Sequence, residues 1–240
     1  MDRKHCAVMV LAGGKGTRMG ADMPKQYMEL AGKPILAHTL LRFQDSLVVD
    51  EIILVVPPTD ISYCECDIKN RYSLSKISAI VCGGADRQQS AYNGFAAIRN
   101  TDSVVLVHDG VRPFAGREII KNVYEAALKV GAAVPAVKVT DTIKVSSDGD
   151  KVIKTLNREN LMAAQTPQAF RYDILQKAYL KAALDGYKGT DDASLVEYAG
   201  YDVHLVNGDK TNIKITTEDD FLYAGYIFGE IVSLKPVRQF

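Results

Sequence analysis

The sequence predicts an α/β fold in which a mostly parallel, twisted sheet is covered by helices on both faces. Short apolar runs alternate with longer stretches of helical periodicity, which is typical of βαβ units. Several of the apolar runs are continuous rather than alternating, as expected for strands that are buried on both faces. A chain of 240 residues is long enough to bury such a core without disulfide bonds.

The predicted elements succeed one another along the chain. Five buried strands are expected at residues 7–11, 51–56, 77–81, 103–107 and 132–137. Helices are expected at residues 34–44, 88–100, 117–130 and 172–185, then near 191–199, and a last one from Thr217. The segment 117–130 has apolar residues at i, i+3 and i+4, which indicates one buried face. Thr217 and Asp220 resemble a helix capping box with Asp in place of Glu or Gln.

Residues 138–159 interrupt this alternation. Polar and apolar residues alternate there around Asp148-Gly149, and Asp-Gly between alternating strands is a strong hairpin signal. Both arms of the hairpin are too polar for a core, so we expect it to project and to contact a partner. Because no linker or repeat divides the chain, we expect a single domain over residues 1–240 that carries this arm.

Composition excludes several classes of protein. Lys plus Arg and Asp plus Glu both number 29, so the formal net charge is zero, which argues against bulk electrostatic binding of nucleic acid. Cys6, Cys64, Cys66 and Cys82 lack zinc-site spacing and are expected to be reduced thiols. No apolar stretch approaches the roughly 20 residues of a membrane span, and the short apolar run near the start lacks a signal-peptide cleavage site. We therefore expect a soluble, cytoplasmic protein with no membrane partner.

A glycine-rich segment, LAGGKGTRMGADMPKQ, comes after the first predicted strand at residues 11–26. Gly13, Gly14 and Gly16 allow backbone N–H groups to approach an anion closely. The segment does not fit Walker A, and a dinucleotide fingerprint would need glycine where Met19 stands. The pattern therefore predicts a phosphate-binding loop of another kind.

Two basic residues of this segment add charge to the loop. Arg18 and Lys25 could hold a triphosphate from two sides, arginine in fork geometry and lysine as a point charge. The alternative is an ordinary turn with solvated basic side chains. Glycines and cations together favour a nucleoside-triphosphate loop.

Two further motifs lie at predicted strand ends. A second glycine turn at residues 83–90 could contact a base or ribose, with the hydroxyl of Ser90. Asp109 ends an apolar strand at the edge where open α/β sheets bind ligands, so its carboxylate could accept from sugar or polyol hydroxyls. Arg112 is next on the loop, and an Asp109–Arg112 ion pair that shapes the turn is the alternative. His108 is expected to pack or to bond to the backbone.

Several motifs together carry a family resemblance. The segments LAGGKGTRMG, MPKQY and GKPIL resemble the pyrophosphorylase signature of sugar-nucleotide transferases. The Pro-Lys-Gln-Tyr form is similar to that of the 2-C-methyl-D-erythritol 4-phosphate cytidylyltransferases and their relatives. Further matching motifs are VTDTIK at 139–144, NRE at 157–159, QTPQAF at 165–170, TDDAS at 190–194 and NIKIT at 212–216. The resemblance covers roughly residues 7–225.

The resemblance implies a fold and an activity. The fold is a Rossmann-like sheet of the nucleotide-diphospho-sugar transferase type, with the hairpin arm reaching a second subunit of a homodimer. The activity is transfer of a cytidylyl group from CTP to 2-C-methyl-D-erythritol 4-phosphate in isoprenoid precursor biosynthesis, with release of pyrophosphate. Mg²⁺ is expected to be held mainly by the CTP phosphates, so no residue is assigned as a metal ligand.

The resemblance also implies roles for individual residues. The implied catalytic residues are Arg18, Lys25, Arg158 and Lys214. Arg18 and Lys25 resemble the residues that stabilise the transition state on the triphosphate, and Arg158 and Lys214 those that hold the acceptor phosphate for in-line attack. The nucleotide contacts implied are Ala12, Gly13, Gly14, Gly84, Ser90 and Thr166. The polyol-phosphate site implied consists of Asp109, Arg112, Thr142 and Thr190. Thr142 and Arg158 lie in the arm and are expected to serve the neighbouring active site.

Three alternatives stay open on the sequence. Ribitol-5-phosphate cytidylyltransferases often carry the Ala-Gly-Gly form found at residues 12–14, whereas TDDASLVE at 190–197 resembles the methylerythritol enzymes. The acceptor-side motif has more weight, because both enzymes share CTP. An inactive nucleotide-binding regulatory protein would be expected to lose the basic residues. An NAD-dependent dehydrogenase is disfavoured by the failed fingerprint.

Overall fold

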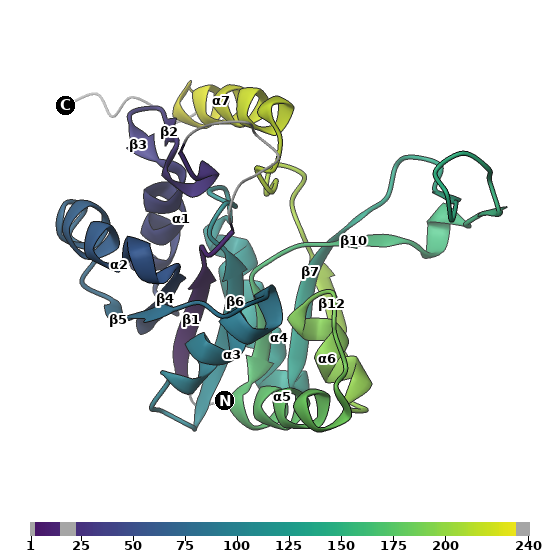
Figure 1. The fold of residues 1–240 in the computed structure, drawn as a ribbon, viewed down its shortest axis with the longest axis horizontal. Helices are drawn as coiled ribbons and strands as arrows, with labels where there is room; N and C mark the ends of the chain where they lie inside the picture. The colour runs from purple at the N-terminus through teal and green to yellow at the C-terminus, as the bar shows by residue number, and fades with distance from the viewer. Residues whose placement is uncertain (1–2, 15–22, 234–240) are drawn as a thin grey trace.

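The computed structural model describes residues 3–14 and 23–233, which form a helix-covered sheet (Figure 1). The eight-stranded sheet has the order β10-β7-β11-β6-β1-β4-β5, with β12 paired to β7. Its strands are β1 His5–Leu11, β4 Glu51–Val56, β5 Ile77–Cys82, β6 Ser103–Asp109, β7 Ala132–Lys138, β10 Met162–Ala164, β11 Gln168–Arg171 and β12 His204–Asn207. The pairs β1–β4, β1–β6 and β4–β5 are parallel. The predicted α/β class and all five predicted strands are thus confirmed.

The sheet also contains strands that the sequence pattern did not predict. β11 runs antiparallel between β6 and β7, and β10 is antiparallel to β7. These strands have only three or four residues, too few to show a period. β11 opens with buried Gln168, whose amide donates to Asp191 Oδ2 and accepts from Ala193 N. Because a polar residue occupies a buried position of β11, the sequence pattern does not reveal this central strand.

Helices cover both faces of the sheet. Their bounds are α1 Ile35–Gln44, α2 Ile61–Tyr63, α3 Arg87–Ala96, α4 Arg117–Val130, α5 Tyr172–Asp185, α6 Asp192–Tyr198 and α7 Glu218–Ser233. The chain continues from α2 as a π-helical segment, Cys64–Asn70, which was not predicted. The helix expected at 88–100 ends at Ala96, because Ala97 N and Ile98 N bond three residues back, to Gly94 O and Phe95 O, and tighten the last turn.

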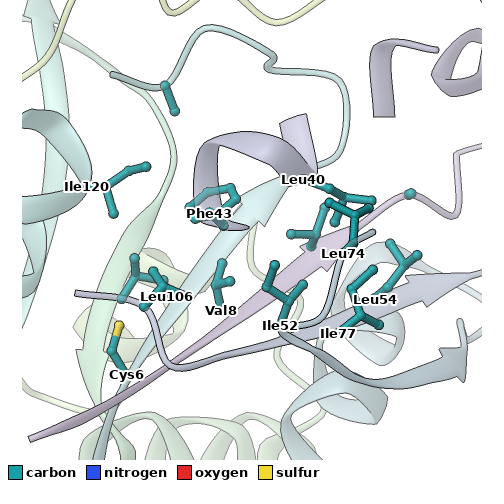
Figure 2. Close-up of a cluster of buried hydrophobic side chains, with 14 of the residues drawn as sticks. Cys6, Val8, Leu40, Phe43, Ile52, Leu54, Leu74, Ile77, Leu106 and Ile120 are labelled. Atoms are coloured by element: carbon teal, nitrogen blue, oxygen red, sulfur yellow. The ribbon is translucent and has the colours of Figure 1, made fainter. Parts of the chain in front are cut away.

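Two apolar layers explain the continuous apolar strands. In Figure 2, Val8 and Leu106 of the sheet lie with Phe43 of α1 and Ile120 of α4 in one layer. Alternate strand residues such as Met9 point to the opposite layer, under α3, α5 and α6. Because successive side chains of a strand point to opposite faces, every position of β1 from Cys6 to Val10 is buried.

The last helix fastens the segment that precedes it. Thr217 Oγ1 accepts from Asp220 N at 3.2 Å, and Asp220 Oδ2 accepts from Thr217 N at 2.9 Å, so the predicted capping box is present. α7 packs through Ala224 and Ile227 on a third cluster that includes Ile215. This anchors residues 212–216 beside the end of β6.

The predicted hairpin is present and projects from the sheet (Figure 1). Its strands, β8 Lys144–Val145 and β9 Lys154–Thr155, are antiparallel. At its tip Gly149 has φ +80°, and Asp148 Oδ1 accepts from the backbone N–H groups of Asp150 and Lys151. A separate small hairpin, β2 Glu29–Leu30 and β3 Lys33–Pro34, precedes α1.

Two further expectations concern cysteines and membrane spans. All four cysteines are free thiols; Cys6 and Cys64 are buried, and Cys66 and Cys82 are exposed. Across residues 3–14 and 23–233, none of the helices combines the length and apolar character needed to cross a bilayer.

The first prediction concerns the core. Replacement of the fully buried Leu54 with alanine is expected to lower the free energy of unfolding by about 2–5 kcal/mol, because transfer and cavity terms add. The matched control is Leu47→Ala, at a leucine that is 94% exposed, which should change stability by about 0.5 kcal/mol or less. Urea unfolding monitored by circular dichroism measures both variants. Equal effects would contradict the assigned packing.

Candidate active site

A cleft of about 590 Å³ opens at the carboxyl edge of the parallel strands. Leu11 and Asp109, the last residues of β1 and β6, are register partners at this edge. Gly110 N donates to Leu11 O at 2.8 Å. Ala12 N donates to Val55 O of β4 at 2.8 Å, and Gly83 N donates to Val56 O of β4 at 2.8 Å. The loops after β1, β5 and β6 are therefore held side by side, which brings the two predicted glycine turns and Asp109 together.

The first glycine turn presents open backbone to the cleft. Gly13 and Gly14 are exposed, and neither has positive φ. A Cβ built on Gly14 would meet no atom of the described residues within 4 Å, so these residues leave space there for a ligand. The buried amide of Gln26 donates to Ala12 O at 2.9 Å and fixes the start of the turn. The glycines thus provide access rather than unusual backbone geometry.

Lys25 lines the same cleft from the short helix Lys25–Tyr27. Next to it a second cavity of about 360 Å³ shares Gly13, Gly14 and Gly84 with the cleft and extends to residues 57–60. The cleft therefore has room for a bulky ligand that spans both spaces. Arg18, the other predicted triphosphate residue, lies outside the described residues.

The second glycine turn is closed by its own hydrogen bonds. Ser90 Oγ accepts from Gly84 N at 3.0 Å and donates to Asp86 O at 2.8 Å. Asp86 caps α3 by accepting from Gln89 N at 2.7 Å, and it pairs with Lys188. Because a carboxylate already satisfies this helix end, it is a poor site for a phosphate. The N–H of Gly84 and the hydroxyl hydrogen of Ser90 are thus already used within the turn.

Asp109 is the centre of a charged cluster at the floor of the cleft. Its Oδ2 lies 3.1 Å from Lys214 Nζ and 3.2 Å from Arg112 Nε. Burial alone would raise the pKa of this carboxyl group, but Lys214, Arg112 and Arg87 outweigh it and lower the pKa to about 2. Asp109 is therefore ionised at neutral pH. The predicted Asp109–Arg112 ion pair exists, and it shapes the turn within the cleft itself.

Arg87 is a cleft residue that sequence reasoning missed. It lines the cleft at the start of α3, and its Nη2 lies 2.8 Å from Asp192 Oδ2. Asp192 is fully buried, and its Oδ1 accepts from Tyr179 Oη at 2.7 Å. Asp191, by contrast, is the cap of α6, as its sequence position suggested. In the sequence, only the TDDAS motif drew attention to Asp192. Arg87 lies more than 100 residues before it, so no local pattern links the two residues.

The structure brings together most of the predicted site residues. Those that line the cleft are Ala12, Gly13, Gly14, Lys25, Gly84, Ser90, Asp109 and Lys214. Thr166 and Arg112 lie behind Asp109, where their polar groups bond to neighbouring residues. Thr190 is exposed before α6, and Thr142 and Arg158 are exposed on the arm; none of the three lines the cleft.

These features define the class of the protein. A phosphate-type glycine loop, cations from separate parts of the chain and a buried carboxylate share one cleft at the carboxyl edge of a mostly parallel sheet. Such a site binds a nucleotide next to a second anion, as nucleotidyltransferases do. Across the described parts of the chain, no group of three or more His, Cys, Asp and Glu side chains forms a metal site.

Comparison with known proteins identifies the family. The profile of IspD, 2-C-methyl-D-erythritol 4-phosphate cytidylyltransferase, matches residues 6–230. The protein of that name from Syntrophus aciditrophicus is 50% identical to this chain over 90% of this chain and 92% of its own length. The protein of that name from Geotalea uraniireducens is 48% identical over 90% of this chain and 93% of its own length. The chain belongs to this family.

Solved structures agree with this assignment. The 4-diphosphocytidyl-2C-methyl-D-erythritol synthase of Anaerococcus prevotii superposes with a TM-score of 0.82 at 33% identity, covering 95% of this chain and all of that one. The 2-C-methyl-D-erythritol 4-phosphate cytidylyltransferase of Francisella tularensis gives a TM-score of 0.79 at 35% identity, covering 92% and 99%. The predicted fold type and family are thus confirmed.

The second prediction tests the electrostatics of Asp109. A carboxyl group whose pKa is lowered on folding stabilises the protein at pH values above 3.8, the ordinary pKa of the group. This stabilisation is lost as the pH falls towards about 2, the pKa of Asp109 in the folded protein. The difference amounts to about 2 kcal/mol at neutral pH. The stability advantage of the wild type over Asp109→Asn should therefore be about 1 kcal/mol smaller at pH 3 than at pH 6.

Urea unfolding at the two pH values measures this difference. Asp202→Asn, at an exposed loop acid, gives the background change for the same substitution. An Asp109→Asn difference that stays constant between pH 6 and pH 3 would contradict the assigned ion pairs.

Proposed function

We propose that this chain transfers a cytidylyl group from CTP to 2-C-methyl-D-erythritol 4-phosphate. The products are 4-diphosphocytidyl-2-C-methyl-D-erythritol and pyrophosphate, in isoprenoid precursor biosynthesis. The observation that carries the proposal is that the open glycine turn and Lys25 share one cleft with the Asp109–Lys214 pair. Two anionic substrates can therefore meet there. A cytoplasmic location belongs to the proposal and agrees with the free thiols.

The reaction needs alignment more than proton transfer. An oxygen of the acceptor phosphate attacks the α-phosphorus of CTP and forms a new P–O bond. The bond from the α-phosphorus to the bridging oxygen breaks, and pyrophosphate leaves with the electron pair. Because the nucleophile is already an anion, no general base or covalent residue is required. The protein has to hold two polyanions in line and to stabilise the charge of the transition state.

We assign these tasks to residues that line the cleft. Gly13 and Gly14 offer backbone N–H groups to the phosphates, and Lys25 supplies a cation beside them, with Arg18 implied by the family motif. Lys214 uses one of its three N–H groups for Asp109, which leaves two for the acceptor phosphate. Asp109 Oδ2 serves the cations, so Oδ1 is the acceptor for a polyol hydroxyl.

We further propose that Mg²⁺ enters with CTP. Asp109 already faces Lys214 and Arg112, so it is poorly placed to hold a second cation, and the triphosphate oxygens are the ligands that magnesium prefers. The bound ion would neutralise charge that develops on the pyrophosphate. No protein ligand is proposed for it.

A homodimer is the last part of the proposal. The arm exposes Val152 and Ile153 by 59% and 63%, and apolar side chains on a projecting hairpin favour contact with another chain. Thr142 and Arg158 lie on the same arm, away from the cleft of their own chain. We propose that they complete the acceptor site of the partner. Arg158 would there supply a forked cation to the acceptor phosphate.

The regulatory and the ribitol alternatives have less support. An inactive regulatory protein has no need for both Lys25 and Lys214 in the cleft, yet both line it. Ribitol 5-phosphate remains the competing acceptor to test, because it too is a polyol phosphate. The relatives from Syntrophus aciditrophicus and Geotalea uraniireducens carry the methylerythritol name.

The third prediction identifies the acceptor. With CTP and Mg²⁺, kcat/KM for 2-C-methyl-D-erythritol 4-phosphate should exceed that for ribitol 5-phosphate by about 100-fold or more, since mispaired polar groups in a site of this kind are costly. Pyrophosphate release measures the rates. Lys25→Ala is the control and should reduce kcat by about 100-fold or more with an unchanged circular dichroism spectrum. A preference for ribitol 5-phosphate would overturn the acceptor assignment.

The fourth prediction tests the shared site. Arg158→Ala and Lys214→Ala are each expected to be nearly inactive. If Arg158 acts in the partner's cleft, a mixed dimer of the two variants contains one intact site and should regain about half of the wild-type activity.

Mixed dimers can be isolated with two different affinity tags after co-expression. If Arg158 acts in its own chain, neither site of the mixed dimer is intact and activity stays absent. If sedimentation velocity shows the wild type to be a monomer at a concentration at which it is fully active, the dimer is removed from the proposal.

A further inference from the structure

A buried polar chain lies directly behind Asp109 and is not used by the reaction. His108, the neighbour of Asp109 in β6, is completely buried. Its Nε2 lies 3.1 Å from Arg112 O, and its Nδ1 lies 2.9 Å from Thr166 Oγ1. Thr166 Oγ1 in turn accepts from Asp109 N at 3.2 Å. The chain thus runs from the loop after β6, through the imidazole, to the backbone of the cleft residue Asp109.

The partners fix the direction of each hydrogen bond. Arg112 O can only accept, so the hydrogen of the imidazole is on Nε2. Nδ1 is then an acceptor and takes the hydroxyl hydrogen of Thr166. The lone pairs of Thr166 Oγ1 remain for Asp109 N. Burial lowers the pKa of His108 to about 4, so the ring is neutral at physiological pH, as this arrangement requires.

The environment leaves the ring little freedom to reorient. Phe43 packs edge-on against the imidazole, with ring centroids 4.8 Å apart. Thr166 precedes Pro167, which has no N–H. The carbonyl oxygen of Thr166 accepts a hydrogen bond from the side-chain amide of the buried Asn212 at 2.9 Å. Thr166 is therefore held from two sides, and it is only 5% exposed.

We infer that His108 and Thr166 are positioning residues that hold Asp109, and with it the acceptor-side cation Lys214, at the end of β6. The inference rests on the proposed function, in which Asp109 and Lys214 contact the acceptor. It also changes the role predicted for Thr166. Its hydroxyl hydrogen is committed to His108, so Thr166 acts through Asp109 and does not donate to the nucleotide.

A matched pair of variants tests this inference as the fifth prediction. His108→Asn keeps an acceptor near the place of Nδ1, facing Thr166, whereas His108→Gln keeps a donor near the place of Nε2, facing Arg112 O. His108→Gln is expected to lower kcat/KM for the polyol phosphate about tenfold, the effect of one lost buried hydrogen bond, with KM for CTP unchanged. His108→Asn should lose much less.

Thr166 provides the second half of the test. Thr166→Val should show the same acceptor-specific loss, Thr166→Ser should restore activity, and combining Thr166→Val with His108→Gln should add no further loss. Equal losses in His108→Asn and His108→Gln, or a raised KM for CTP in Thr166→Val, would overturn the inference. The first result would indicate packing alone, and the second a nucleotide contact.

A measurement on the wild-type protein tests the inference even if the variants fail to fold, and it does not depend on which acceptor the enzyme uses. Long-range proton–nitrogen NMR correlations of the imidazole should show hydrogen on Nε2 and an unprotonated Nδ1 in His108. Hydrogen on Nδ1 would overturn the inference even if the enzyme is active. If neither polyol phosphate is a substrate but the Nε2–H tautomer is found, the proposed function fails while the positioning network stands.

Discussion

The buried carboxylate of Asp109 is the constraint on which the rest of the site depends. A carboxylate removed from water is costly unless cations and hydrogen bonds surround it. Arg112 provides one cation from the adjacent loop, and Lys214 provides another from more than 100 residues further along the chain. Arg112 Nη1 also donates to Asn212 O at 2.8 Å, so the same arginine ties both segments together. The ion pairs that satisfy Asp109 therefore also place Lys214 in the cleft.

The two glycine turns give the cleft a direction. Among the described residues, none approaches the Cβ position of Gly14 in the turn after β1, whereas the turn after β5 is closed by Ser90 and by the Asp86 cap. Backbone N–H groups in open space suit phosphate, and a closed turn beside a carboxylate does not. Under the proposed function, the phosphates of CTP would therefore lie towards Gly14 and Lys25 rather than towards Gly84.

Burial and strand ends made part of the fold and of the site predictable from the sequence. Parallel strands buried on both faces leave continuous apolar runs in the sequence, and their carboxyl ends meet at one edge of the sheet. The sequence therefore predicted that Asp109 and the glycine turns lie close together. Contacts between distant polar side chains leave no such pattern, which is why the Arg87–Asp192 pair was missed. A motif gives the order of residues but not the direction of a side chain. For that reason Thr166 could be placed near the site but not behind it.

Charge balance gives a physical reason for the proposed second subunit. The transition state joins two polyanions, yet among the described cleft residues Lys214 is paired with Asp109 and Arg87 with Asp192. These pairs cancel much of the positive charge that the cleft would otherwise offer to phosphates. A cation without a buried carboxylate beside it can then offer more of its charge to the transition state. Arg158 is exposed on the projecting arm and bonds only to Thr140 O among the described residues, so in the proposed dimer its charge would be available to the partner's cleft.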